Sequence, residues 1–384
     1  MTTPTQRYAN IQPGDPSPSF QQRAFGQPRF ELGSLGGRYL VVCFFVSTAL
    51  DGAREAIASA FSRADLFDDR FASFIGISND PGDEAERRVA DRSPGYHFVW
   101  DFDGKASRLY GAISVDAELV GGSVTAQPTC VVLDPTLRVI KVSRLGAPET
   151  FDEVIDYLDG LPPPERFAGI ELQAPIIVLP NVFEPDLCRR LMTLYDTIGG
   201  EESGVMQDIG GKTVGVLNPL YKRRRDCTIE DEDLLTTIRS RFSRRVVPEI
   251  AKIHQFGVTR MERYIVACYS AADGGHFGAH RDNTTKGTAH RRFACSINLN
   301  ADFEGGEVGF PEYGPRTFKP PPGGAVVFSC SLLHCVSKVT RGSRYAFLPF
   351  LYDDAAAAIR EANMQFVAEA GPPPAAAEPT AVAA

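Results

Sequence analysis

The first part of the chain, up to Leu161, alternates apolar runs with stretches in which apolar residues recur at helical spacing. The runs contain few polar residues, which is typical of strands buried on both faces of a sheet. Strands that alternate with helices in this way predict an α/β domain with a central sheet. The predicted strands are Tyr39 to Phe45, Phe74 to Ile77, Pro128 to Leu133 and Leu137 to Val142, and the predicted helices lie near Asp51 to Ala60 and Asp83 to Val89.

The order of elements changes in the second part of the chain. Amphipathic stretches come first and predict helices near Pro185 to Ile198 and near Asp231 to His254, with a possible break in the second at Pro248. Short strand-like runs follow, separated by Gly and Pro turns, and this spacing predicts an antiparallel barrel or jelly roll. The predicted strands are Arg263 to Cys268, Phe293 to Leu299, Glu307 to Phe310, Ala325 to Cys330 and Tyr345 to Leu351.

Two changes in composition divide the chain. A run of three prolines follows Leu161, and an Ala- and Pro-rich tail follows an Ala-rich helical stretch after Tyr352. Such segments cannot bury enough apolar surface to form a core, so they predict a linker and a disordered tail. The expected organisation is a flexible N-terminus (1–13), an α/β domain (14–161), a Pro-rich linker (162–169), a β-rich domain with flanking helices (170–353) and a helical, then disordered tail (354–384).

Charge and cysteine content narrow the function classes. The net charge of -8 argues against a general nucleic-acid partner, which needs a basic surface, and no apolar run reaches the roughly 18 residues of a membrane span. The N-terminus lacks the pattern of a secretory signal, and the eight cysteines form no C-x-x-C pair. We therefore expect a cytoplasmic protein with reduced cysteines. The basic run Lys222 to Arg225 is either a solvated loop or a docking site for an acidic substrate segment.

One set of residues carries the chemistry of a metal site. In an extended strand His280 and Asp282 point to the same face, roughly 6.6 Å apart, so one small cation can bind both. His334, directly after the strand Ala325 to Cys330, supplies a third ligand. Two imidazoles and one carboxylate form the facial triad of Fe(II) oxygenases, whose open positions suit a bidentate 2-oxo acid and O2. Arg344 is placed to pair with the distal carboxylate of that acid.

The segment from Tyr264 to Tyr352 resembles the double-stranded β-helix domain of prolyl-4-hydroxylase-like 2-oxoglutarate dioxygenases. The resemblance rests on YSAADGGHFGAHRDN, SINLN, EGGEVGFPE and HCVSKVTRGSR. It implies that His280, Asp282 and His334 bind Fe(II) and act in catalysis, and that Arg344 binds the C5 carboxylate of 2-oxoglutarate. Tyr269 matches the family tyrosine that faces the co-substrate. Asn298 stands where some prolyl hydroxylases place a tyrosine that contacts the same molecule.

The α/β domain resembles a thioredoxin-fold redoxin of the peroxiredoxin type, through GDPSPSF, LVVCFFVS, IGISNDP, VWDFDGKASRLYGA and PTCVVLD. A peroxidatic cysteine should follow the first of these strands, at a helix N-terminus that lowers its pKa. Val46 to Ala53 contains no cysteine, and Ala53 or a neighbour holds that place. Cys43 and Cys130 lie within apolar strands. We therefore interpret this domain as a degenerate redoxin that serves as a binding or scaffold module and is not a peroxidase.

Together the two resemblances imply a 2-oxoglutarate-dependent Fe(II) dioxygenase that uses O2, releases succinate and CO2, and is kept reduced by L-ascorbate. Its substrate could be a prolyl or other side chain of a peptide or protein, or a small molecule. Two alternatives stay open. One is a redox-sensing or adaptor protein that acts through its redoxin half, and the other is a thiol peroxidase that uses Cys43.

Overall fold

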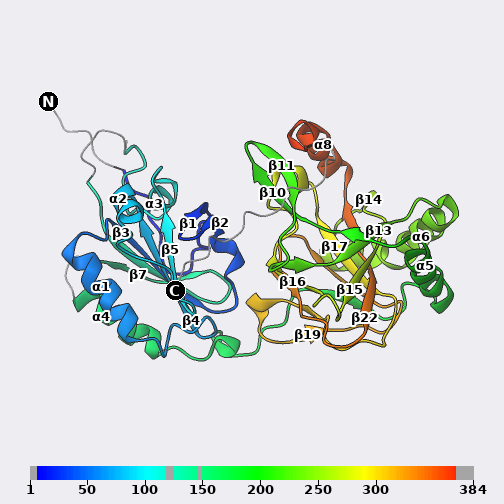
Figure 1. Cartoon of the computed structure of the whole chain (residues 1–384), viewed down its shortest axis with the longest axis horizontal. Coiled ribbons are helices and arrows are strands. Elements are labelled where there is room, and N and C mark those ends of the chain that lie inside the picture. The colour runs from blue at the N-terminus through cyan, green and yellow to red at the C-terminus, as the bar shows by residue number, and fades with distance from the viewer. Residues whose placement is uncertain (1–6, 118–124, 146–148, 369–384) are drawn as a thin grey trace. The chain divides into compact units, whose positions relative to one another are not determined.

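The computed structural model describes residues 7–117, 125–145 and 149–368 (Figure 1). The chain divides into two compact units: unit 1 is Met1–Gln173 with the short segment Pro311–Gly314, and unit 2 is Ala174–Phe310 with Pro315–Ala384. Within the described ranges no helix has both the length and the apolar character needed to cross a membrane. The predicted disordered tail lies largely outside the described residues, although its helical first part is present.

Unit 1 is built on a seven-stranded sheet with the order β2-β1-β5-β4-β3-β6-β7. The three central strands, β3 to β5, are parallel, and the strands on either side pair antiparallel. Every residue of β4 is buried, as expected for a strand covered on both faces. The strands are β1 (Gln21–Ala24), β2 (Gln27–Glu31), β3 (Tyr39–Val46), β4 (Ala72–Ser78), β5 (Tyr96–Trp100), β6 (Thr129–Leu133) and β7 (Val139–Arg144).

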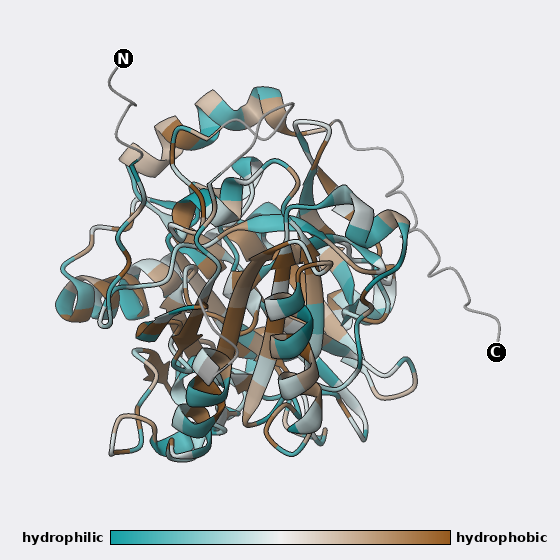
Figure 2. Ribbon diagram, turned by 90° about the vertical axis from the view of Figure 1, so that its left-hand side faces the viewer, coloured by the Kyte–Doolittle hydropathy of each residue, from teal (hydrophilic) through white to brown (hydrophobic). Residues whose placement is uncertain are grey.

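Helices cover both faces of this sheet. The helices are α1 (Asp51–Ser62), α2 (Pro81–Ala85), α3 (Lys105–Leu109) and α4 (Glu149–Asp159). Ile57 of α1 and Phe151 of α4 share a core with Val41 and Cys43, which lie on one face of β3. Ala106 of α3 packs in a second core with Leu40, Val42 and Phe44, the alternate positions of β3. Successive side chains of this strand therefore enter the two cores in turn. Figure 2 shows the result as brown strands beside helices that are partly teal.

The described part of unit 2 contains two large antiparallel sheets and a separate two-stranded sheet, β10-β11. One large sheet has the order β12-β16-β21-β18-β19. The other has the order β14-β23-β17-β22-β15-β13-β9, with β20 pairing β17 and β8. The first strands are β8 (Ile177–Leu179), β9 (Glu201–Glu202), β10 (Val205–Ile209), β11 (Lys212–Val216), β12 (Lys222–Arg223), β13 (Arg225–Thr228), β14 (Arg260–Glu262) and β15 (Ile265–Ser270). The others are β16 (His276–His280), β17 (Phe293–Asn298), β18 (Val308–Gly309), β19 (Thr317–Phe318), β20 (Ala325–Ser329), β21 (His334–Val336), β22 (Ser343–Phe347) and β23 (Phe350–Tyr352).

Helices pack on the outer face of the larger sheet, where α5 and α6 lie beside its strands (Figure 1). The helices are α5 (Pro185–Ile198), α6 (Glu232–Arg245), α7 (Val247–His254) and α8 (Asp354–Asn363). Along β15, Val266 belongs to the core under these helices, whereas Ala267 and Tyr269 belong to a smaller core between the sheets. Alternation along this strand therefore directs Tyr269 to the interior of the jelly roll.

The structure confirms the predicted fold class, an α/β thioredoxin-like domain followed by a jelly-roll domain with flanking helices, and corrects several details. The helix expected near Asp83 to Val89 is wrong in extent, because α2 ends at Ala85 and Arg87 has a left-handed φ of 49°. The break anticipated at Pro248 in the second long helix is confirmed, with Pro248 in the first turn of α7. The strand predicted over Tyr345 to Leu351 is two strands, interrupted beside Pro349, which has no N–H to donate.

Candidate metal and co-substrate site

The three predicted metal ligands meet between the two sheets of unit 2. His280 ends β16 and His334 begins β21, and the two residues are paired across these strands. Asp282 follows two residues later and is fixed by its backbone N–H, which donates to the carbonyl of Cys330 at 2.9 Å. The Asp282 carboxylate lies 3.5 Å from Nε2 of His280 and 3.3 Å from Nε2 of His334. All three ligand atoms lie within 4.8 Å of one another, which is the spacing that a single cation requires.

Backbone carbonyls orient both imidazole rings. Nδ1 of His280 lies 2.8 Å from the Gly278 carbonyl, and Nδ1 of His334 lies 3.0 Å from the Leu332 carbonyl. A ring whose Nδ1–H donates to a carbonyl leaves Nε2 free to bind a metal. Burial, and next the neighbouring His334, lower the pKa of His280 to about 4, so this ring is neutral at neutral pH. His280 is therefore ready to bind a cation without first losing a proton.

Charge and aromatic packing complete the triad. Burial alone would raise the pKa of Asp282, but the neighbouring imidazoles, His334 first, hold it well below its usual value. Phe277 stacks on the His280 ring with centroids 3.5 Å apart, and Phe328 lies 4.6 Å from the His334 ring. These rings replace water around the ligands, which strengthens electrostatic interactions inside the site.

Arg344 lies in the same cavity as the triad and is almost fully buried, at 1% exposure. Its Nε donates to Oδ1 of Asn298 at 3.0 Å and its Nη2 donates to Oγ of Ser296 at 2.7 Å. Nη1 is buried and has no hydrogen-bond partner among the described residues. A buried guanidinium with an unused N–H group and no carboxylate within ion-pair distance is costly unless a ligand supplies the anion. The arrangement therefore fits a carboxylate-bearing co-substrate.

Of the other two predicted co-substrate residues, Tyr269 lines the cavity and Asn298 lies beside it. Tyr269 lines the cavity, and the guanidinium carbon of Arg344 lies 5.4 Å from its ring centroid. Asn298 is buried beside the cavity, with its Oδ1 held by Arg344 and its Nδ2 donating to the Pro320 carbonyl at 2.8 Å. Both ends of the Asn298 amide are thus engaged by the protein, and this residue orients Arg344.

The basic run Lys222 to Arg225 is not a solvated loop, which corrects that interpretation. It forms parts of β12 and β13, and the period of two buries Lys222 and Arg224 while Arg223 and Arg225 are exposed. Nζ of Lys222 donates to Ser203 Oγ and the Gly204 carbonyl, and burial lowers its pKa well below the usual value. The sequence shows that four basic residues are adjacent. Which of them are buried follows only from the alternation of side chains along the backbone in the structure.

The cavity contains two further arginines that the sequence did not place at the site: Arg224, predicted only as part of the basic run, and Arg263. Asp226 balances both, because its carboxylate lies 2.7 Å from Nε of Arg224 and 2.9 Å from Nη2 of Arg263. Arg224 also donates to the Tyr269 hydroxyl at 3.3 Å. Burial, and next the charge of Arg224, lower the pKa of Arg263 to about 10. One carboxylate for two guanidinium groups leaves the cavity with excess positive charge, which suits a dicarboxylate such as 2-oxoglutarate.

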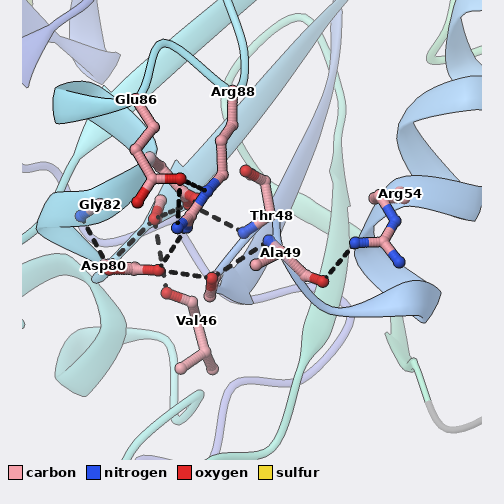
Figure 3. Close-up of polar contacts among 11 residues, drawn as sticks. Val46, Thr48, Ala49, Arg54, Asp80, Gly82, Glu86 and Arg88 are labelled. Atoms are coloured by element: carbon pink, nitrogen blue, oxygen red, sulfur yellow. Dashed lines mark hydrogen bonds and ion pairs between the residues drawn. The ribbon is translucent and has the colours of Figure 1, made fainter.

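In unit 1 the segment Val46 to Ala53, where a peroxidatic cysteine is expected, contains no cysteine, and Ala53 is buried in the first turn of α1. Cys43 and Cys130 are paired across β3 and β6, with Sγ atoms 2.8 Å apart, and both are fully buried. Burial, and next Cys130, raise the pKa of Cys43 well above its usual value, which opposes formation of a thiolate. The loop before α1 is hydrogen-bonded, through Ser47 and the backbone N–H of Thr48, to the carboxylates of an ionic network around Arg88, shown in Figure 3.

Comparisons with known proteins agree with an oxygenase-like site in unit 2 and a redoxin-like fold in unit 1. Residues 264–352 match the family model of the 2OG-Fe(II) oxygenase superfamily, and residues 13–142 match that of the AhpC/TSA family. A PKHD-type hydroxylase of Cupriavidus metallidurans is 35% identical over 95 residues, which are 22% of this chain and 42% of the relative. The chain thus spans about half the length of the curated relatives it matches.

Two solved structures are similar to one half of the chain each. A prolyl hydroxylase of Trichoplax adhaerens, in complex with a hypoxia inducible factor peptide fragment, is 15% identical and has a TM-score of 0.37, with 51% of this chain and 93% of that chain covered. Peroxidoxin BcpB of Mycobacterium tuberculosis is 22% identical and has a TM-score of 0.33, with 39% and 94% covered.

The fold of unit 2 and its cluster of two histidines and one carboxylate resemble those of oxygenases that build their centre from these residue types. Residues 264–352 carry the match to the 2OG-Fe(II) oxygenase superfamily and residues 13–142 the match to the AhpC/TSA family, and Val46 to Ala53 within the second match contains no cysteine.

Proposed function

We propose that the protein is a 2-oxoglutarate-dependent Fe(II) dioxygenase that hydroxylates its substrate and releases succinate and CO2. The observation that supports this most directly is the cluster of His280, Asp282 and His334, with a neutral His280 ring and an ionised Asp282, together with the unpartnered buried Nη1 of Arg344. The cluster fits a divalent metal, and Arg344 fits the far carboxylate of a dicarboxylic acid. A metal bound there would supply activation of O2 and of the 2-oxo acid.

In this proposal the residues of the chain bind, orient and exclude water. His280, Asp282 and His334 would hold the metal through Nε2, a carboxylate oxygen and Nε2. Arg344 would bind the C5 carboxylate through Nη1, while Asn298 and Ser296 keep the guanidinium in place by accepting from its other nitrogens. Locking a planar guanidinium before the ligand arrives lowers the entropy lost on binding.

Several finer parts of the proposal rest on the family likeness, on the cysteines and on the net charge. The substrate is a prolyl or other side chain of a peptide or protein, or a small molecule, and ascorbate keeps the iron reduced. A reducing, cytoplasmic location is supported by the eight cysteines, which form no disulfide among the described residues. The net charge of -8 supports a partner other than nucleic acid. Unit 1 acts as a binding or scaffold module that raises the local concentration of substrate.

Succinate formation tests the activity directly. Purified full-length protein is incubated with Fe(II), 2-oxoglutarate and O2, with and without ascorbate, and then with cell extract analysed by mass spectrometry for products 16 mass units heavier, the mass of one oxygen atom. We expect slow succinate formation without extract and faster formation with it. Absence of succinate under all these conditions, in protein shown to bind Fe(II), would contradict the proposal. Rapid consumption of hydrogen peroxide that depends on Cys43 would favour the thiol peroxidase alternative.

A further inference from the structure

Unit 1 contains a groove of about 660 Å³ beside the loop that precedes α1. Its volume falls within the roughly 300 to 1,000 Å³ typical of small-molecule sites. The proposed oxygenase chemistry does not use this groove, because all of its lining residues belong to unit 1. They come from the loop, from α1 and from the segment after α2: Thr48, Ala49, Arg54, Ile57, Ala58, Phe61, Arg87, Arg88, Val89, Ala90 and Arg92.

A network of hydrogen bonds and ion pairs holds the two walls of the groove in place (Figure 3). Nη1 of Arg88 lies 2.8 Å from both Asp80 and Asp83, and Nη2 lies 2.9 Å from Glu86. The loop is tied to the same carboxylates, because the backbone N–H of Thr48 donates to Asp83 at 2.8 Å. This network holds three carboxylates for the one guanidinium of Arg88, and none of the three lines the groove, so Arg88 is fully paired and serves as the frame of the groove. A groove that is formed before its ligand arrives loses less entropy on binding.

The remaining charges of the groove do not cancel. Arg54 pairs with Asp51, but Arg87 and Arg92 have no acidic partner among the described residues. The lining set contains four arginines and no acidic residue. The guanidinium of Arg92 stacks on the Phe61 ring at 3.7 Å from its centroid, which fixes its plane and leaves its N–H edge available. Two guanidinium groups without counterions make this part of the groove a site for an anion.

Two further features of the groove indicate what kind of ligand it can bind. Ile57, Ala58 and Val89 give the groove an apolar wall beside the free arginines, which suits a ligand with an apolar body. Thr48 is 3% exposed and lines the groove, and its Oγ1 has no hydrogen-bond partner among the described residues. A buried hydroxyl without a partner is costly, so a ligand or water that reached it would remove a penalty.

We propose that this groove binds a small organic anion, with its carboxylate or phosphate held by Arg87 and Arg92 and its apolar body packed against Ile57, Ala58 and Val89. The site takes the place of the lost peroxidase chemistry in unit 1: the same loop and helix that lack a reactive cysteine form a binding site for an anion. The proposal is independent of the metal site in unit 2.

Binding of defined probes to the full-length protein tests the proposal. Sodium benzoate, phenyl phosphate, benzamide and acetate are titrated at low ionic strength, with binding followed by saturation-transfer NMR and calorimetry. Benzoate and phenyl phosphate separate a preference for carboxylate from one for phosphate. We expect saturable binding of at least one of them, with benzamide and acetate each about ten-fold weaker or more, because benzamide lacks the charge and acetate lacks the apolar body. Added salt should weaken binding of the anions.

Variants locate the binding. Arg87→Ala and Arg92→Ala should each weaken benzoate about three- to five-fold, and the two together at least about ten-fold, with partial recovery in Arg92→Lys. Arg70→Ala is the matched control, since Arg70 is an exposed arginine of unit 1 outside the groove. The titration is repeated in Arg344→Ala, so that a carboxylate cannot be counted at the co-substrate pocket. Benzoate affinity unchanged in the double variant, equal affinity for benzamide, or no probe binding would overturn the proposal.

Discussion

Replacement of Arg344 by alanine is the sharpest test of the co-substrate pocket. The substitution removes the one cavity guanidinium for which no carboxylate partner is present among the described residues. Removal of one partner from a buried, hydrogen-bonded charge pair costs about 2 to 5 kcal/mol. At about 1.4 kcal/mol for each factor of ten, the affinity for 2-oxoglutarate should fall by roughly 30- to 5,000-fold.

The same substitution should change the stability of the ligand-free protein much less. It leaves the acceptors on Asn298 and Ser296 without their donors, which costs about 1 to 3 kcal/mol for a buried group. It also removes a buried cation whose pKa is lowered by burial, and this relief acts in the opposite direction. A strong loss of co-substrate affinity with a melting temperature close to that of the unmodified protein is therefore the expected signature.

Initial rates of succinate formation against 2-oxoglutarate concentration, with thermal melts of the same preparations, measure both effects. Arg344→Lys should recover only part of the affinity, because an ammonium cannot hold Asn298, Ser296 and a carboxylate in one plane. Arg341→Ala is the control, since Arg341 is 67% exposed in its side chain and pairs with Glu304. A half-saturating 2-oxoglutarate concentration that is unchanged in Arg344→Ala would refute the assignment and direct attention to Arg224 and Arg263.

Three other predictions concern the metal, the cysteines and the pH dependence of unit 1. Asp282→Ala and His334→Ala should each abolish succinate formation and weaken Fe(II) binding while the circular dichroism spectrum is retained; turnover at the unmodified rate in either variant would remove the triad from the mechanism. Residues 1–165 expressed alone should reduce hydrogen peroxide no faster than a free thiol, and Cys43→Ala should leave succinate formation by the full chain unchanged, because Cys43 is buried with a raised pKa. Burial alone would lower the pKa of His97, but Asp69 and Asp91 raise it to about 9. Since this lies above the unfolded value of about 6.5, the stabilisation is fully present below pH 6.5 and is lost as the pH rises through about 9. Unfolding of unit 1 should therefore become easier by about 3 kcal/mol across this window in the unmodified chain and not in His97→Gln.

The sequence alone was sufficient for the fold class of both halves and for selecting three side chains, His280, Asp282 and His334, that the structure brings within 4.8 Å of one another. Buried strands that alternate with helices, and short strands separated by turns, reflect backbone periods that act locally, so they can be read without coordinates. The spacing of His280 and Asp282 is informative for the same reason, because an extended chain fixes the relation between residues i and i+2. Elements with polar composition were missed, such as β1 and β2, since they lack the apolar signal that marks a strand.

Tertiary structure decided what depends on contacts between residues that are far apart in the chain. Only the packing of β12 and β13 shows that Arg224 faces the cavity while its neighbours face solvent, because both faces of that run have the same composition. Only the pairing of β17 with β22 shows that Asn298 orients Arg344, since 46 residues separate them along the chain. Propensity and spacing describe the backbone of a segment, whereas charge balance and hydrogen-bond partners in a cavity are properties of the segments that meet there.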